Sequence, residues 1–320
     1  MSNRVINFLI LAAIAMSAAF TSCGKDKDDK DDVILVTEIV TDWGNEINSL
    51  TFEYDDQHRI TKITQQSLYD GKIWGSVSTL QYNAAGDLVR FEEEDGDFRT
   101  FARLGNRIAV TSSWWGNESG VQRSHVFDLN AQGLLEKITW KYNNHNNGNW
   151  DEEIITFQYL GGNIIKMNYE WEAMWYGESG SESVTANVTY DDKHSPFLNT
   201  NTPQWFLAWW FDEAPFGTRN NIKTMAAEDD DGSEYSLNIN YSYNSADFPV
   251  SRVITGFEEG GWCNNCEEYH EDEEWTYSQT FSYGPSTTKH ALSGSNSLQE
   301  SPREMRRDNP RPFGRNVCGR

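Results

Sequence analysis

The chain has 320 residues, a formal net charge of −23 at pH 7 and an aromatic content of 13%. So large an excess of negative charge disfavours anionic membrane surfaces and nucleic acid as partners, and no nucleic acid is expected to bind. The length allows one large all-β domain or two smaller domains.

The N-terminal segment, residues 1–22, has the features of a secretory signal peptide. Arg4 and the amino terminus form a short positive region, and residues 8–20 (FLILAAIAMSAAF) form an apolar run. This run is shorter than the roughly 20 residues that a bilayer-spanning helix needs, which disfavours a permanent helical anchor. Two small residues then precede Cys23. We therefore predict export, with Cys23 at the cleavage site.

The residues Phe20-Thr21-Ser22-Cys23 resemble the lipobox of bacterial lipoproteins, although Phe20 stands where Leu is usual. The resemblance implies that a peptidase cuts before Cys23 and that a diacylglycerol is joined to its sulfur. A lipidated Cys23 would attach the protein to a membrane. The alternative is a free thiol near an ordinary cleavage site.

Residues 23–32 follow as a hydrophilic tether. From Gly24 to Asp32 the sequence holds three Lys, five Asp and no apolar side chain, so this stretch cannot bury itself. The simplest interpretation is a spacer. A Lys with acidic neighbours just after the lipidated Cys also resembles the surface-export signal of Bacteroidetes lipoproteins. That resemblance implies an outer-membrane lipoprotein that faces the cell exterior.

Residues 33–284 have the pattern of an antiparallel β domain. Aromatic and β-branched residues alternate with polar ones in short runs bounded by Gly, Asn and Asp, which is typical of strands joined by tight turns. Leu50, Phe52 and Tyr54 share one face of a strand, and turn residues follow them. Similar hairpin units recur at residues 50–63, 79–91, 101–110, 126–138, 156–167, 187–197 and 240–254.

These units predict an all-β fold. We expect a large antiparallel meander of repeated hairpins, in the form of an open twisted sheet or a soluble porin-like barrel. Few helices are expected, and residues 203–211 (PQWFLAWWF) are a short helix or a hydrophobic loop. A barrel that spans the membrane is disfavoured by the lipoprotein signal and by the irregular spacing of the strands.

The lipobox, the acidic tether and the repeated Tyr-Asp or Tyr-Asn hairpins together resemble a Bacteroidetes lipoprotein family of unknown function. The similarity covers about residues 33–284 and implies a porin-like antiparallel β fold. The pairs Tyr54-Asp55, Tyr82-Asn83 and Tyr190-Asp191 also resemble the tyrosine-aspartate repeats of large bacterial shell-forming toxins, which implies a similar long sheet. Neither resemblance supplies a catalytic residue.

Tryptophans in or near expected loops are the candidate ligand-binding residues. Adjacent tryptophans on a strand point to opposite faces, so one of each pair is exposed unless another segment covers it. An exposed indole stacks on a sugar ring or packs on a partner protein. We therefore predict a glycan-binding or protein-binding surface, and the alternative is a small core under a long loop. The candidates are Trp114, Trp115, Trp205, Trp209 and Trp210.

The stretch of residues 262–274 (WCNNCEEYHEDEE) contains a Cys-x-x-Cys motif. Redox catalysis by Cys263 and Cys266 is disfavoured because the flanking residues are acidic and no βαβ pattern surrounds the motif. A local disulfide or a pair of thiols is the simpler interpretation. Together with His270 the two cysteines would offer three zinc ligands, one fewer than a structural site needs. No metal site and no cofactor are expected.

Acidic runs at residues 92–97, 228–231 and 267–274 are interpreted as solvated turns, since they lack EF-hand spacing. Paired carboxylates could hydrolyse a glycan, but the sequence does not single out a pair. An enzyme is therefore less expected than a binding module, and a purely structural envelope protein is the other alternative.

Residues 285–320 differ from the rest of the chain. They contain Lys289 and six arginines but only three acidic residues, and they show no alternation. We expect a basic, disordered tail. A basic interaction arm, a dispensable extension and a sequence from a shifted reading frame are the alternatives for its role.

Overall fold

The computed structural model describes residues 33–113, 120–211, 217–230, 232–259, 262–263, 268–269, 272–284 and 299–300. The predicted signal peptide and the tether, including Cys23, lie outside the described residues. The elements in chain order are β1 (Leu35–Asp42), β2 (Glu46–Tyr54), β3 (Ile60–Tyr69), β4 (Lys72–Tyr82), β5 (Leu88–Glu93), β6 (Phe98–Leu104), β7 (Arg107–Ser112), β8 (Val121–Leu129), β9 (Leu135–Asn144), β10 (Asn149–Leu160), β11 (Asn163–Trp175), β12 (Glu178–His194), α2 (Gln204–Trp210), β13 (Asn220–Asp229), β14 (Glu234–Tyr243), β15 (Pro249–Glu258), β16 (Trp262–Cys263), β17 (Glu268–Tyr269), β18 (Glu273–Gly284) and β19 (Gln299–Glu300).

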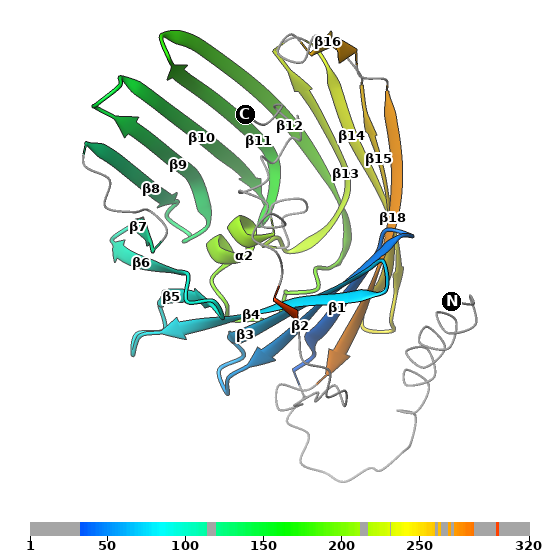
Figure 1. Ribbon diagram of the computed structural model, residues 1–320. Coiled ribbons are helices and arrows are strands. Elements are labelled where there is room, and N and C mark those ends of the chain that lie inside the picture. The colour runs from blue at the N-terminus through cyan, green and yellow to red at the C-terminus, as the bar shows by residue number, and fades with distance from the viewer. Residues whose placement is uncertain are drawn as a thin grey trace, which may run out of the picture. The chain divides into compact units, whose positions relative to one another are not determined.

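Sixteen antiparallel strands, β1 to β15 and β18, form a closed barrel (Figure 1). Each strand pairs with the next one along the chain, and β15 pairs with β18. The barrel closes because β1 pairs with β2 on one edge and with β18 on the other, where Ile39 is opposite Phe281. The predicted all-β antiparallel fold is confirmed, and of the two predicted forms the chain adopts the closed barrel.

Two short pairings lie outside this ring of strands. β16 and β17 form a separate two-stranded sheet. β19 falls within residues 285–320, which were expected to be disordered, and it pairs in parallel with β4, with Gln299 opposite Trp74 and Glu300 opposite Gly75.

The helix α2, which comes between β12 and β13 in the chain, lies inside the barrel (Figure 1). Of the two alternatives for residues 203–211, a short helix is therefore observed. Trp205, Phe206, Leu207 and Ala208 of this helix are buried. A short helix with apolar residues on every side is stable only when other apolar groups surround it, and the inside of the barrel supplies them.

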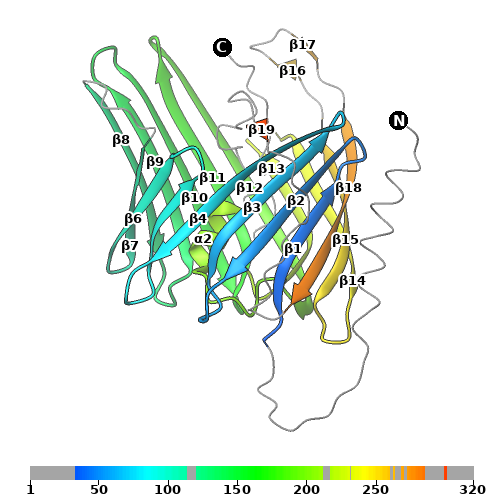
Figure 2. The ribbon, with the colours of Figure 1, turned by 60° about the horizontal axis from the view of Figure 1, so that its bottom comes forward.

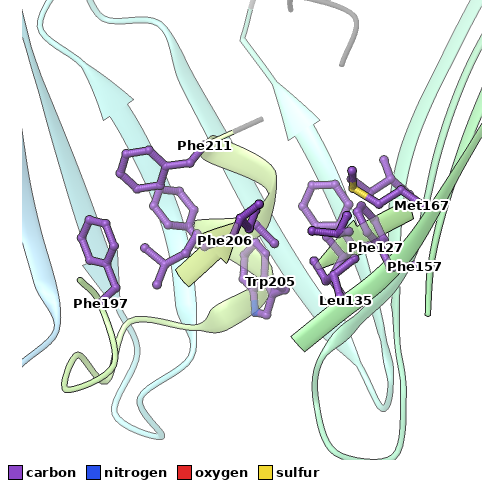
Figure 3. Close-up of a cluster of buried hydrophobic side chains, with 14 of the residues drawn as sticks. Phe127, Leu135, Phe157, Met167, Phe197, Trp205, Phe206 and Phe211 are labelled. Carbon is purple, nitrogen blue, oxygen red and sulfur yellow. The ribbon is translucent and has the colours of Figure 1, made fainter. Parts of the chain in front are cut away.

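Aromatic contacts join α2 to the strands. The ring of Trp205 lies 5.1 Å from the ring of Phe101 and 5.5 Å from that of Phe127, between ring centroids. Phe206 lies 5.9 Å from Phe91 in the same way. Figure 3 shows this cluster, in which inward-facing side chains of β8 to β11 lie on one side of Trp205 and Phe206, and Phe197 and Phe211, which flank α2 in the chain, lie on the other. The core therefore fills the barrel around α2.

Hydrogen bonds fix the segment that carries α2 to one end of the barrel, here called the plugged end (Figure 2). Thr202 Oγ1 accepts from the backbone N–H of Ile60, which begins β3, at 2.8 Å. Gln204 Oε1 accepts from the N–H of Leu135, which begins β9, at 3.2 Å. The Asn199 side chain donates to the carbonyl of Ile34, just before β1, at 2.9 Å. The opposite end, where β1, β9 and β11 finish, is here called the far rim.

Short hairpin loops at the plugged end share one geometry. After β4, Asn83 Oδ1 accepts hydrogen bonds from the N–H groups of Ala85 and Asp87, both at 2.9 Å, and Gly86 has φ +88°. A type I turn followed by a bulge requires a positive φ at this position, which glycine adopts without strain. The same side-chain bonds occur at Asp55, Asn130 and Asn244, with positive φ at His58, Gly133 and Asp247.

Tyrosines near these loops connect neighbouring hairpins. The Tyr82 hydroxyl donates to the carbonyl of Ile60 at 2.8 Å, and the Tyr159 hydroxyl donates to that of Leu135 at 2.8 Å. Burial raises the pKa of both phenols above the usual range, so both remain donors at neutral pH. Tyr82, the tyrosine of the Tyr82-Asn83 pair, therefore donates a hydrogen bond to the carbonyl of Ile60, the first residue of β3.

The outer face of the barrel is mostly polar. Phe157 of β10 and Met167 of β11 are directly opposite each other and buried, so they point inward. The pairs on either side of them, Gln158 with Lys166 and Thr156 with Asn168, therefore point outward. On the same outer face Lys141 and Glu152 form an ion pair at 2.6 Å. Other outward positions carry Thr51, Thr79, Thr189, Thr224, Ser236, Asn238, Asn240, Thr276 and Thr280.

An apolar interior with a polar exterior is the reverse of the arrangement in barrels that span a bilayer, whose outward band is apolar. Among the described residues, no helix is both long and apolar enough to cross a membrane.

Candidate ligand-binding wall inside the barrel

The inward face of β9, β10 and β11 changes character between the core and the far rim. Near the core it carries Ile138 and Met167, which are buried. Side chains alternate between the two faces along a strand, and directly opposite residues on paired strands share a face. The pairing of β9, β10 and β11 therefore shows which residues nearer the far rim also point inward. They include four large aromatic side chains, here called the aromatic wall: Trp140, Tyr142, Trp171 and Trp175.

Three rings of the aromatic wall form a near-parallel stack. The ring centroids of Trp140 and Tyr142 are 6.5 Å apart, with 8° between the planes. Those of Tyr142 and Trp175 are 5.5 Å apart, with 9° between the planes. The Arg123 guanidinium lies 5.3 Å from the Tyr142 centroid, and the Asn144 amide donates to the Tyr142 hydroxyl at 3.3 Å. The middle ring is thus held by its neighbours and by polar contacts.

The fourth ring, Trp171, is fixed by one hydrogen bond and one close approach. Its Nε1 donates to Asp151 Oδ1 at 2.7 Å. The ring lies beside Gly180 of β12, where a Cβ would be 3.2 Å from the indole. Gly180 therefore leaves the space that Trp171 occupies.

Water reaches the aromatic wall. Trp175 is 39% exposed, and Trp140, Tyr142 and Trp171 are half-buried. Phe157, on the same inward face but nearer the plugged end, is buried. Inward-facing rings that remain partly exposed leave some of their surface available to a ligand.

Carboxylates alternate with these rings around the barrel. Glu153 is directly opposite Trp140 on one side and Trp171 on the other. Glu182 is opposite Trp171, and Glu258 is opposite Tyr235 further round the inward face. These three carboxylates are half-buried. The inward face toward the far rim therefore combines flat apolar surface with hydrogen-bond acceptors and negative charge.

A second aromatic cluster lies at the far rim on the β1 and β18 side. Trp43 follows β1 and is 37% exposed, and its ring centroid lies 3.9 Å from that of Tyr277. Trp275 stacks on Tyr277 at 5.5 Å with 17° between the planes. Gly256 of β15 makes room for Trp275, since a Cβ there would lie 2.1 Å from the indole.

The candidate tryptophans of residues 203–211 are part of α2. Trp205 is 4% exposed and part of the core, which is the alternative stated for these residues and leaves its ring closed to a ligand. Trp209 and Trp210 are partly buried against the core. The ring of Trp209 packs against Phe127 at 5.6 Å between centroids, and the Arg99 guanidinium lies 5.5 Å from its centroid.

The remaining candidate residues lie wholly or partly outside the described residues. Trp114 and Trp115 lie outside the described residues, as do Cys266 and His270. Cys263 belongs to β16, but its side chain is outside the described part of the structure. Within the described ranges, no group of three or more His, Cys, Asp or Glu residues is arranged to hold a metal ion.

Sequence reasoning did not select the aromatic wall, although a signal for it exists. Trp140 and Tyr142 follow Ile138 at intervals of two residues, and Trp171 and Trp175 continue the alternation of Met167. Side chains at such intervals share the core face of a strand. Large aromatics that extend a core face beyond the length the core needs are candidates for an exposed interior surface.

No protein-family model matches the chain, and no curated protein matches it. Among solved structures, a porin-like protein from Bacteroides uniformis is 14% identical, with 78% of this chain and 96% of that chain covered and a TM-score of 0.46. A porin-like protein from Bacteroides vulgatus is 12% identical, with 78% and 99% covered and a TM-score of 0.34. TcdB2-TccC3 without its hypervariable C-terminal region is 11% identical, with 71% and 15% covered and a TM-score of 0.19. Function is therefore inferred from the residues of this barrel.

Proposed function

We propose that the chain is a lipid-anchored outer-membrane protein whose barrel binds a glycan on the aromatic wall. The observation that carries the proposal is the near-parallel stack of Trp140, Tyr142 and Trp175 on the inward face, with Trp175 39% exposed. Flat aromatic surface suits the apolar faces of sugar rings, and its rigidity keeps the entropic cost of binding low.

The polar groups around the wall support a glycan rather than a purely apolar ligand. Glu153 lies opposite two of the wall's tryptophans, and Asp151 already accepts a bond from Trp171 Nε1. Carboxylate oxygens accept hydrogen bonds from hydroxyl groups, and such bonds are strong because the acceptor is charged. A saccharide would therefore find a stacking surface and hydroxyl partners on the same strands.

The proposed anchor precedes the barrel in the chain. The chain enters the barrel through β1, which begins at the plugged end. A lipid on Cys23 would hold the barrel at the membrane through the residues that precede β1. Two or more acyl chains hold a protein stably at a bilayer, so no membrane-spanning element is needed. The polar outer face suits a barrel surrounded by water.

A glycan array followed by calorimetry tests the binding site. We expect the double substitution Trp140→Ala and Trp175→Ala to weaken binding of an array hit by at least roughly tenfold, because buried aromatic contacts dominate such interfaces. Trp150→Ala is the matched control, since Trp150 lies on β10 but points to the outer face, opposite Met174. Equal affinities for the double variant and the parent would contradict the site.

A glycan hydrolase is the second candidate. Asp151 and Glu153 both point inward on β10, and Glu153 lies directly opposite Trp140 and Trp171, so two carboxylates lie beside the proposed glycan surface. Glycan hydrolysis uses a pair of carboxyl groups at the scissile bond, one as acid and the other as base or nucleophile. Incubation of array hits with the protein, followed by a search for shortened products, separates the two candidates. Shortened products that vanish with Glu153→Gln would favour the hydrolase, and intact glycans would favour the binder.

A further inference from the structure

β4 has an edge that the barrel does not use. Its residues from Lys72 to Thr79 pair with β3, whereas β5 pairs only with those from Ser78 to Tyr82. The cause is length, because β5 has 6 residues and β4 has 11. The β5-facing edge of residues 72–76 therefore carries no β5 partner.

Two residues near the C-terminus, Gln299 and Glu300 of β19, occupy part of this edge. β19 pairs in parallel with β4 at Trp74 and Gly75. Both of these residues already pair with β3, through Ser67 and Gln66, so β19 lies on the edge that β5 leaves open. Addition of an extended segment to an open sheet edge is a recurring mode of peptide recognition. Since β4 begins at the far rim, β19 lies toward that end of the barrel (Figure 2).

The residues after β19 complement the inward face in charge. Residues 301–320 contain six arginines and two acidic residues, Glu304 and Asp308. The inward face carries Glu153, Glu182 and Glu258 beside the aromatic rings. Arginine suits such a surface because its guanidinium pairs with carboxylates and stacks on aromatic rings.

The reach of this segment is sufficient. A barrel of sixteen strands spaced about 4.8 Å apart and tilted about 40° is roughly 30 Å wide. Twenty extended residues span roughly 60 Å, so a segment fixed at β4 can cross to the wall on β9, β10 and β11.

We propose that the C-terminal segment is a built-in competitor for the aromatic wall. Gln299 and Glu300 dock on the open edge of β4, and the arginines that follow cover the acidic and aromatic inward face. An external ligand must then displace them. Competition with an external ligand rests on the proposed glycan site. Docking of β19 on β4 is independent of that proposed function.

Hydrogen exchange tests the docking step. We expect those amides of residues 73–76 that point away from β3 to exchange at least tenfold more slowly in the full chain than in a chain that stops at Gly284, which keeps all sixteen strands of the barrel. Should the shortened chain not fold, the full-length double substitution Gln299→Pro and Glu300→Pro replaces it, because proline removes the backbone donors of β19. Equal exchange in either comparison would overturn the docking.

A synthetic peptide with the sequence of residues 299–320 tests the competitor. We expect the peptide to bind the chain that stops at Gly284 and to change the tryptophan fluorescence of that chain. We expect its affinity to fall at least tenfold when all six of its arginines are replaced by glutamine. The peptide should also bind less tightly to the Glu153→Gln and Trp175→Ala variants of that chain, whereas Trp150→Ala should leave its affinity unchanged. No binding, or equal binding of the glutamine peptide, would overturn the proposal. Because the probe is the chain's own sequence, a failure of glycan binding leaves this test intact.

Discussion

At the scale of single residues, His125 shows how the barrel interior controls charge. It lies on β8, directly opposite Trp140, and is 8% exposed. Its ring packs edge-on against Phe127, with 4.8 Å between ring centroids. Burial, with a smaller contribution from the positive charge of Arg99, lowers the pKa of His125 from 6.5 to about 4. The imidazole is therefore neutral at pH 7.

This lowered pKa predicts a pH dependence of stability. Between pH 6.5 and about 4 the unfolded chain binds a proton at His125 that the folded chain does not, so the free energy of unfolding falls as the pH falls. The loss is on the order of 3 kcal/mol across this interval. We expect the free energy of unfolding, measured by urea denaturation, to depend less steeply on pH for His125→Gln than for the parent. The carboxylates contribute equally in both proteins, so the difference reports His125. Identical profiles would show that His125 titrates normally.

At the scale of elements, the hairpin loops carry a testable local requirement. A Cβ at Gly86 would lie 3.5 Å from the Arg59 guanidinium, an ordinary contact, so space is available there. The constraint is the φ of +88°. We expect Gly86→Ala to lower the free energy of unfolding by about 1 kcal/mol, because alanine is strained in this conformation.

The matched control for this loop is Gly86→Asn. Asparagine adopts positive φ more readily than alanine, so the loss should be smaller. The urea concentrations at the unfolding midpoints of the two variants and of the parent measure these losses. A larger loss for asparagine than for alanine would show that side-chain contacts, and not the backbone conformation, govern this position.

The same loops explain how much of the fold was predictable. Alternation and turn residues are local signals, and they correctly predicted antiparallel strands and an all-β domain. The location of α2 was not predictable, because residues 203–211 are apolar on all sides and only the surrounding strands decide what they pack against. That is why Trp205 was selected as a ligand-binding candidate and is found in the core.

At the scale of the whole molecule, closure of the barrel has no local signal. It depends on pairing between β1 and β18, whose partners Ile39 and Phe281 lie at opposite ends of the described barrel sequence. The register of β9, β10 and β11 alone places Trp140 and Trp175 on one face of the sheet, and closure of the barrel makes that face part of an enclosed interior. Long-range pairing and side-chain exposure are therefore the two features that sequence patterns could not supply.

The polarity of the closed barrel leads to a prediction about membrane attachment. The outward positions of β10 and β11 include Gln158, Lys166 and Asn168, which suit water, so the barrel itself should not hold the protein in a bilayer. We expect Cys23→Ala to move the protein from the membrane fraction to the soluble fraction. Cys318→Ala serves as the control and should remain with the membrane.

A chain that starts at Val33 completes this test, since it lacks both Cys23 and the tether but retains every strand of the barrel. It should be recovered without detergent and should show the far-ultraviolet circular dichroism of a β protein. If this chain requires detergent, or if the Cys23→Ala protein stays in the membrane fraction, the barrel and not a lipid makes the attachment.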